Sequence, residues 1–448
     1  LIALRNIVRQ KAYSIINISG LAISIMSCLL ILMYVTDELS YDRFHERGDR
    51  IYRLFFRYTS PNGESFNHAV GPYRLADELS VRYPEIEEAV RLSFSSPMEL
   101  RYGEIEFVED NVMLADSNIF RLFSIDVLAG DPATALTEPF TCVVSDEVAG
   151  KFFGEENPVG KSLEIDTPLG VTEITITGVF RTFPGNSHIK PDMLGSMATA
   201  DYMYNDRQKY HWGEGTVASY ILLPQGVPGE ELEAKFPDLI REIFDDEEAT
   251  DFVKFWLQPL YDTHLKSDLR FDFEPHGDLT TVLVFSLVAL FILIIATINY
   301  MNLSTARSAR RAKEVGLRKL AGGQRSQLIR QFLTESISMV FLAMILALIL
   351  AQFLLPFFNT VSGKTFVIND LLNVKVMVAL LAATFVIGIL AGSYPSFVLS
   401  SFRPVKALYR DTRGVRSGFT LRKILVVLQF SISIALIITT LVIYSQWR

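Results

Sequence analysis

The sequence contains few of the residue patterns that mark an enzyme or a metalloprotein. Cysteine occurs twice in 448 residues, as Cys28 in an apolar run and as Cys142 in a polar region, so no disulfide can form within that region. None of the six histidines is spaced for a zinc site, and no G-x-S-x-G elbow occurs. Ser187 and His188 lie near Asp192, but a triad is defined by geometry, and a turn with local hydrogen bonds is favoured. We expect no catalytic residue, no metal site and no directly bound cofactor.

Two glycine-rich stretches resemble nucleotide-binding loops but lack their essential features. In GEENPVGKS (Gly154–Ser162) five residues separate the glycines, whereas the phosphate loop G-x-x-x-x-G-K-[ST] has four. Pro158 interrupts this loop, and the following residues alternate like strands instead of opening a helix. LAGGQRSQL (Leu320–Leu328) resembles the signature loop of an ABC ATPase, but it lies between two apolar runs without a surrounding nucleotide domain. The chain is therefore not expected to hydrolyse ATP itself.

The sequence does contain long apolar runs. Half of its residues are hydrophobic. Five runs lack Asp, Glu, Lys and Arg, and each is long enough to cross the ~30 Å hydrocarbon layer as a helix. These runs are Ile15–Val35, Val282–Met301, Ile337–Phe358, Val376–Leu399 and Ile424–Tyr444. A buried helix of a soluble protein is a weak explanation for five runs, so we predict an α-helical polytopic membrane protein. The first run is too long for the core of a cleaved signal peptide and is expected to be an anchor.

Charge is distributed unevenly along the chain. Residues 37–280 contain 46 acidic and 21 basic side chains, whereas the remainder contains 4 and 21. Eight basic residues against one acidic residue lie in 304–332, and seven against one in 401–423. Because short loops rich in Lys and Arg stay in the cytoplasm, we expect the N-terminus, 304–332 and 401–423 inside. The acidic region 37–280 is then expected outside.

The outer region has the pattern of a large α+β domain. Two strand–helix–strand sets are predicted, at Ile51–Tyr58, Pro72–Tyr83 and Ala89–Phe94, and at Val217–Leu223, Gly229–Phe244 and Phe252–Leu257. Two such sets split by an insert indicate a ferredoxin-like split βαβ core. The insert, from about Met98 to Gly215, has a β-rich pattern.

The basic segment Ser304–Phe332 combines two helical patterns with a glycine break. Arg310, Glu314 and Arg318 follow one another at i, i+4 spacing, which supports one exposed helical face. A loop that only satisfies the positive-inside rule would explain the charge but not the break. We therefore interpret the segment as a compact helix that docks a cytosolic partner.

Several stretches resemble one known family, the MacB/FtsX-like ABC transporter permeases. Asn299–Ser336 is similar to the family's coupling-helix region, most specifically in its R-x-x-E-V-G-L-R-K core, and Ala391–Leu408 to the end of its last span. Asn111–Gly130, Val143–Leu163 and Val179–Leu194 resemble its periplasmic core domain. The chain departs from the family in having no fused ATPase domain and in carrying two adjacent glycines where many relatives carry one.

The resemblance implies a non-catalytic permease subunit in the bacterial inner membrane, with a separate cytosolic ABC ATPase that uses the ATP. It implies ATPase-coupling residues at Arg310, Arg311, Lys313, Glu314, Gly316, Arg318 and Lys319. Gly392 and Pro395 interrupt the fourth run and are expected to form a membrane hinge, because proline removes a backbone hydrogen bond.

These observations predict the domain boundaries. Residues 1–36 are the cytoplasmic leading helix and first span, 37–280 the MacB-type periplasmic core domain, 281–303 the second span, 304–332 the coupling helix and 333–400 the third and fourth spans. The FtsX-like permease domain covers 281–408, a basic cytoplasmic linker 401–423, and the fifth span 424–448.

The two ends of the chain show a weak internal repeat. LRNIVRQKAYSI from Leu4 and LRKILVVLQFSI from Leu421 share five identities in twelve aligned positions, and both lead into an apolar run. We expect the fifth run to begin a second copy of the module in a longer protein. A dimeric arrangement is then expected, through that second copy or a homodimer.

Two functional hypotheses follow. In the first, ATP binding by the partner moves the coupling helix, and the spans pass that motion to the periplasmic domain to drive export or release of a substrate. In the alternative, the same mechanism serves an antimicrobial-peptide sensor or a scaffold that activates a cell-wall hydrolase. The expected partners are the ATPase, the lipid bilayer and a periplasmic adaptor or hydrolase, with no nucleic acid.

Overall fold

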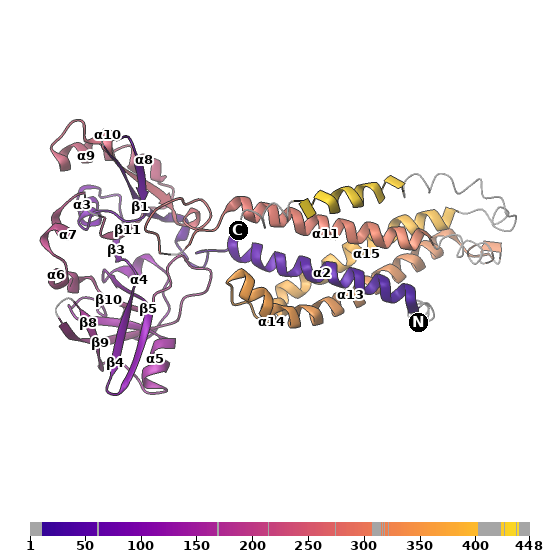
Figure 1. Cartoon of the computed structure of the whole chain (residues 1–448), viewed down its shortest axis with the longest axis horizontal. Coiled ribbons are helices and arrows are strands. Elements are labelled where there is room, and N and C mark those ends of the chain that lie inside the picture. The colour runs from indigo at the N-terminus through magenta and orange to yellow at the C-terminus, as the bar shows by residue number, and fades with distance from the viewer. Residues whose placement is uncertain are drawn as a thin grey trace. The chain divides into compact units, whose positions relative to one another are not determined.

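A computed structural model of the chain contains two compact units. The structure describes residues 11–401 apart from 61, 168–169, 214, 274, 307–314, 316, 318 and 321, together with 423–424, 426–435 and 437–438. The first unit, called here the helical unit, comprises Leu1–Thr36 and Thr280–Arg448, and the second, the sheet unit, comprises Asp37–Leu279. Figure 1 draws the helices of the first and the strands of the second.

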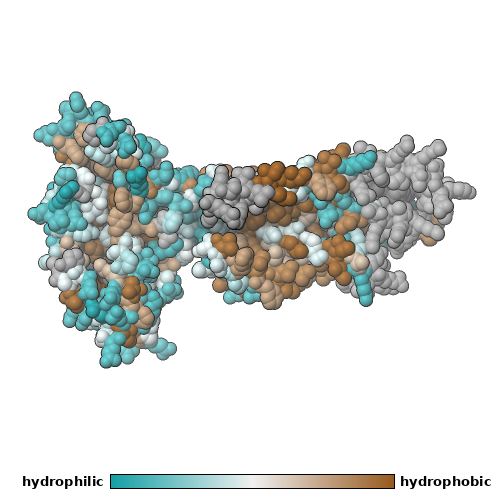
Figure 2. Space-filling view, in the orientation of Figure 1, coloured by the Kyte–Doolittle hydropathy of each residue, from teal (hydrophilic) through white to brown (hydrophobic). Residues whose placement is uncertain are grey.

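Among the described residues, four long apolar helices form the helical unit. They are α2 (Lys11–Leu39), α11 (Leu279–Ala306), α13 (Arg325–Ser362) and α15 (Val374–Ser401), with the short α14 (Ile368–Leu372) before α15. Each of the four is long and apolar enough to cross a membrane. Figure 2 shows hydrophobic surface over these helices, as expected where lipid replaces water. Four predicted spans are thus confirmed, and the described part of the fifth includes the apolar helix Val426–Ala435.

The core of the sheet unit has the predicted ferredoxin-like topology. Its strands are β1 (Ile51–Thr59), β3 (Glu88–Ser93), β11 (Val217–Leu222) and β12 (Val253–Pro259), and β2 (Ser65–His68) also pairs with β1. The four strands lie in the order β3-β11-β1-β12, and every neighbouring pair is antiparallel. Two βαβ units that interleave their strands produce this order.

Helices pack against this core. They are α3 (Leu75–Arg82), α8 (Gly229–Glu233), α9 (Phe236–Phe244) and α10 (Ala249–Phe252). Their apolar residues share a core with Leu54 and Phe56 of β1. The single helix predicted at Gly229–Phe244 is wrong, because the chain forms two helices there. Pro237 lies in the first turn of α9, where its missing N–H leaves no helical hydrogen bond unmade, and it favours a new helix start.

The insert extends the same sheet and is rich in strands, as predicted. Its strands are β4 (Ser96–Tyr102), β5 (Ile105–Ala115), β6 (Val127–Gly130), β7 (Thr141–Ser145), β8 (Ser162–Thr167), β9 (Gly170–Phe180) and β10 (Met193–Ser196). Its helices are α4 (Ile119–Leu122), α5 (Asp146–Phe153), α6 (Ala200–Met203) and α7 (Asp206–Tyr210). The strand order is β10-β7-β9-β8-β4-β5, and β5 pairs with β3 where Leu92 faces Ala115. Core and insert therefore form one continuous sheet.

The stretch that resembles a phosphate loop is a turn between a helix and a strand. Gly154 ends α5 with a φ of 61°, and β8 and β9 follow as the predicted pair of strands. Lys161 forms an ion pair with Glu156. A strand, β8, thus follows Lys161 directly where a phosphate loop would open a helix, so the stretch does not form a phosphate loop.

The orientation of the chain in the membrane gives a labelling prediction. Val81 lies on α3 and is 85% exposed. We expect Val81→Cys to react with a membrane-impermeant maleimide in intact spheroplasts and Ser308→Cys not to react, because the charge bias places 37–280 outside and 304–332 inside. Cys28 and Cys142 are both buried, which keeps the background low. Permeabilised spheroplasts control for reactivity at both positions, and labelling of Ser308→Cys alone in intact cells would reverse the orientation.

Candidate functional site

The two ends of the sheet unit, residues 37–48 and 260–279, are joined by buried polar contacts. Glu38, at the end of α2, is 3% exposed, and its Oε2 lies 2.8 Å from Nε2 of His264. Tyr41 stacks on the same imidazole, with ring centroids 3.4 Å apart. A Cβ on Gly277 would lie 2.5 Å from Oε2 of Glu38 and 2.7 Å from Nε2 of His264. A side chain at this position would therefore displace the Glu38–His264 contact that joins the incoming and outgoing segments.

A second set of buried hydrogen bonds runs from Asp42 into the sheet. Asp42 is 0% exposed, and its Oδ1 accepts the hydroxyl of Ser187 at 3.2 Å and the backbone N–H of His188 at 3.1 Å. Nδ1 of His188 lies 2.9 Å from the same oxygen, and Nε2 lies 2.8 Å from the hydroxyl of Tyr220. Asp42 thus connects residues 37–48 to the insert and, through His188, to strand β11.

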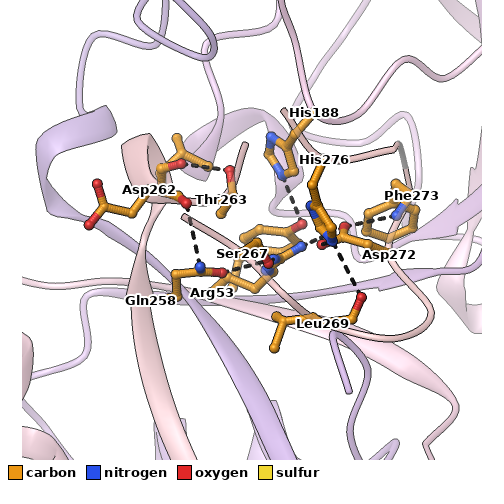
Figure 3. Close-up of polar contacts among 12 residues, drawn as sticks. Arg53, His188, Gln258, Asp262, Thr263, Ser267, Leu269, Asp272, Phe273 and His276 are labelled. Atoms are coloured by element: carbon orange, nitrogen blue, oxygen red, sulfur yellow. Dashed lines mark hydrogen bonds and ion pairs between the residues drawn. The ribbon is translucent and has the colours of Figure 1, made fainter. Parts of the chain in front are cut away.

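Arg53 is the central charge of the third set of contacts. Figure 3 shows its guanidinium among Gln258, Ser267 and Asp272. It donates to Oδ1 of Asp272 at 2.7 Å, to Oε1 of Gln258 at 2.8 Å and to the hydroxyl of Ser267 at 3.1 Å. Arg53 also faces Tyr220 in the register of β1 and β11. The Arg53 side chain is 0% exposed and that of Asp272 is 7% exposed, so the ion pair must replace the water that both charges lose.

Neighbouring charges determine the protonation of the buried acids. Burial alone would raise the pKa of Asp42, but His188 by its charge and hydrogen bonds, together with the charge of His45, holds it below its usual value. Burial acts in the same direction on Asp272, and the charge and hydrogen bond of Arg53 hold its pKa below the usual value. Both groups are therefore carboxylates at neutral pH.

His45 is a buried histidine beside this network. It is 2% exposed, and its Nδ1 accepts the backbone N–H of Ser124 at 3.2 Å. Burial lowers the pKa of His45 to about 4; the charge of Asp42 opposes this shift, and that of His188 adds to it. His45 is therefore neutral in the folded unit at pH 7.

These residues form a structural network rather than a hydrolase site. Ser187 is 0% exposed and contacts Asp42, whereas Asp192 accepts the backbone N–H of Asn111 at 3.0 Å. Ser187, His188 and Asp192 thus do not form a triad. Their hydrogen bonds are not only local, because Asp42 is 145 residues away from Ser187. Among the described residues, no three metal-ligating side chains are grouped as a metal site.

Six of the seven predicted coupling residues lie outside the described residues, namely Arg310, Arg311, Lys313, Glu314, Gly316 and Arg318. The seventh, Lys319, is half-buried in a helical segment that also includes Leu317 and Leu320. Gly322 follows with a φ of 89°, and the side chain of Gln324 caps α13 through reciprocal hydrogen bonds with Gln327. Among the described residues, the predicted glycine turn therefore lies between helical residues and α13, while most of the predicted first helix lies outside them.

One buried residue fixes this segment to α13. Val315 is 2% exposed and packs with Leu328 and Phe332 in the first turns of α13. Leu317 and Leu320, by contrast, are 54% and 59% exposed. The segment thus folds back on the helix that follows it and still presents two apolar side chains.

Gly392, predicted to be part of a hinge, lies in a close helix contact. A Cβ on Gly392 would lie 2.7 Å from Cβ of Ser336, and one on Gly388 would lie 2.8 Å from Cγ1 of Ile337. Both glycines belong to α15, and both contacted residues belong to α13. The G-x-x-x-G spacing therefore lets the two helices approach closely. The backbone of α15 is helical on both sides of Pro395.

Two sequence profiles match the chain. The MacB-like periplasmic core domain matches residues 14–239, and the FtsX-like permease C-terminal domain matches residues 286–404.

Individual proteins match this chain at low sequence identity or over a short stretch. A macrolide export ATP-binding/permease protein MacB from Campylobacter jejuni is 31% identical over 132 residues, which cover 30% of this chain and 20% of that protein. Another, from Hahella chejuensis, is 22% identical over 359 residues, which cover 78% of this chain and 50% of that protein. The crystal structure of the periplasmic region of MacB from Actinobacillus actinomycetemcomitans covers 48% of this chain and 91% of its own, with 14% identity and a TM-score of 0.34. The chain spans at most half the length of these two sequence relatives.

The neutral state of His45 predicts a pH dependence of stability. The folded pKa is lowered from 6.5 to about 4, so the contribution of neutral His45 is present above pH 6.5 and is lost as the pH falls toward 4. This loss amounts to roughly 3 kcal/mol. We expect the thermal unfolding midpoint in detergent to fall between pH 7 and 4.5, and to fall less in His45→Asn, whose amide oxygen can still accept the Ser124 N–H. The exposed His211→Asn is the matched control, and equal pH slopes in all three proteins would contradict the assignment.

The glycine contact predicts a position-specific effect in α15. Gly388→Leu would place atoms on Ile337, and overpacking of this kind costs ~1–3 kcal/mol. We expect a lower thermal unfolding midpoint in detergent for Gly388→Leu. Ala382→Leu, an exposed small-to-large change on the same helix, should leave the midpoint unchanged. An equal midpoint for both variants would show that the close approach of α13 and α15 does not contribute to stability.

Proposed function

The chain belongs to the MacB/FtsX-like family of ABC transporter permeases, and on this basis we propose that it couples ATP turnover by a separate cytosolic ATPase to movement of its sheet unit. The profile of the MacB-like periplasmic core domain covers half of the chain, and the FtsX-like permease profile covers most of the remaining helices. In this proposal the chain itself binds no cofactor, and the ATPase binds and hydrolyses the ATP.

The observation that carries the proposal is the folded segment between α11 and α13. Leu317 and Leu320 are one helical turn apart and exposed, while Val315 is buried against α13. A basic segment that is anchored by one side chain and presents two leucines is suited to dock a protein. The charged residues predicted to dock the partner, Glu314 among them, would select it.

Displacement of this segment would be transmitted directly to the long helices. Val315 packs on Leu328 and Phe332, so the segment and the start of α13 move together. Gly388 and Gly392 bring α15 against α13, and the hydroxyl of Tyr300 on α11 donates to Ser336 on α13 at 2.9 Å. Close-packed helices transmit a shift better than loosely packed ones because they cannot deform continuously.

The sheet unit would receive this motion through its two ends. α2 continues as a helix to Leu39, and α11 begins at Leu279, so the chain enters and leaves the sheet unit next to helical segments. Within the sheet unit, Glu38 and His264 tie these two ends together, and Gly277 packs against both. A displacement of either end would therefore act on the whole buried network.

The proposed output is export or release of a substrate on the outer side of the membrane. The proposed partners are the cytosolic ATPase, the lipid bilayer, a periplasmic adaptor or hydrolase, and a second module of the same kind. The N-terminus is proposed to be cytoplasmic and the sheet unit periplasmic, as the charge bias indicates. The proposed coupling step is the same for export and for sensing.

The coupling step is tested by reversing one charge. Glu314→Lys places three positive charges at i, i+4 spacing, which costs only a few tenths of a kcal/mol per pair within the helix. At an interface, like charges can cost several kcal/mol, and ~1.4 kcal/mol corresponds to about tenfold in affinity. We expect Glu314→Lys to express and insert normally but to co-purify with its cytosolic ATPase partner at least about tenfold less. Gly316→Pro, which breaks the helix, should do worse.

The matched control is Glu247→Lys, the same charge reversal at an exposed acid of the sheet unit. Inserted protein is quantified in parallel so that loss of binding is separated from loss of folding. Normal co-purification and normal ATP turnover with both Glu314→Lys and Gly316→Pro would show that the segment is only a basic loop.

A further inference from the structure

The sheet unit contains a cavity that the proposed coupling does not use. Its volume is about 320 Å³, within the range of small-molecule sites, and it lies between the strands of the insert and the described residues of 199–213 and 215–216, which lead back to β11. Val112, Met113 and Leu114 of β5 form part of its floor, and Met203 of α6 and Gln208 of α7 part of its roof.

The wall of this cavity is mainly apolar and deformable. Four methionines line it, Met98, Met113, Met193 and Met203, from three different strands and from the roof. Ile174 adds a rigid branched side chain. Unbranched thioether side chains adapt to the outline of an apolar guest, so the wall can fit ligands of related shapes.

Three hydroxyl groups on the wall already have partners within the protein. The hydroxyl of Ser93 accepts the backbone N–H of Leu114 at 2.7 Å, and that of Thr199 accepts the N–H of Phe140 at 2.9 Å. The hydroxyl of Thr216 donates to the carbonyl of Gln208 at 3.2 Å. Among the described lining residues none is charged. A charged guest would lose its water here without gaining a counter-charge, whereas an apolar guest gains burial.

The roof is built so that it can admit a guest. α7 buries none of its residues, and Asn205 and Gln208 cap it through hydrogen bonds to each other. The start of the roof is fixed more firmly, because Met197 and Ala200 are buried in a small cluster with Tyr73 and Val217. Segments with few buried contacts open at low free-energy cost, so α7 can move while the start of the roof remains in place.

We propose that this cavity is a binding site for an uncharged, mainly apolar small molecule. The site lies entirely within the sheet unit, and it does not depend on the coupling proposed above. Its expected selectivity is for shape and absence of charge, because the wall offers burial and no free ionic partner.

The experiment measures protection of a cysteine at the cavity. Ser96 lines the cavity and is exposed, so Ser96→Cys provides a nearly isosteric reporter. The full chain, in lipid nanodiscs, is treated with a membrane-impermeant maleimide in the presence of N-phenyl-1-naphthylamine, an uncharged aromatic probe. At a free probe concentration about ten times its Kd, we expect the labelling rate of Ser96→Cys to fall about tenfold. Val81→Cys on α3 is the matched control and should react at an unchanged rate.

The sulfonated analogue of the probe tests the proposed selectivity. 8-Anilino-1-naphthalenesulfonate has a similar aromatic frame with a negative charge, and it should not protect Ser96→Cys. Met203→Lys, made in the Ser96→Cys background, should abolish protection by the uncharged probe and allow protection by the sulfonate, whereas Met203→Leu should leave both results unchanged. No protection by the uncharged probe, equal protection of Ser96→Cys and Val81→Cys, or equal protection by both probes would overturn the proposal.

Discussion

The sheet unit is organised around the buried charge of Arg53. A guanidinium with no exposed surface is tolerated only if other groups replace its water, and three separate parts of the chain do so. Gln258 comes from strand β12, Ser267 and Asp272 come from the segment that leads to α11, and Tyr220 faces it from β11. The course of residues 260–279 is therefore determined by an electrostatic requirement as well as by apolar burial.

The same requirement explains why the two ends of the sheet unit are joined. The outgoing segment that carries Asp272 to Arg53 also carries His264, which contacts Glu38. Asp42 and His188 make an equivalent connection between the incoming segment and the insert. Removal of one partner from a buried ion pair leaves the other charge unpaired, so loss of any one of these partners is expected to be costly. In a protein that is proposed to transmit force, such contacts would resist separation of the two ends.

Periodicity and charge were sufficient to predict the elements, but not the buried network. The apolar runs became α2, α11, α13 and α15, and the strand patterns became β1, β3, β11 and β12, since each depends on local composition. The apolar pattern predicts one helix at Gly229–Phe244, but the structure has two there. Pro237 is a helix start signal and lies where α9 begins. Glu38 and His264 are 226 residues apart and belong to no motif, so no local signal could have paired them. The Gly388–Gly392 spacing is visible in the sequence and marks a helix contact, while the hinge expected at Gly392 and Pro395 stays a prediction.

The way the insert joins the core has a consequence for how such domains can diversify. The insert leaves after β3 and returns at β11, and Ser93 and Val217, the residues at these two points, face each other in register. Neighbouring strand ends of this kind could be closed by a short hairpin, so the core order β3-β11-β1-β12 does not depend on what is inserted there. The insert does, however, supply His188 to Asp42. A lineage that replaced the insert would therefore keep the ferredoxin-like topology without adjustment, but it would have to provide a new partner for one buried carboxylate.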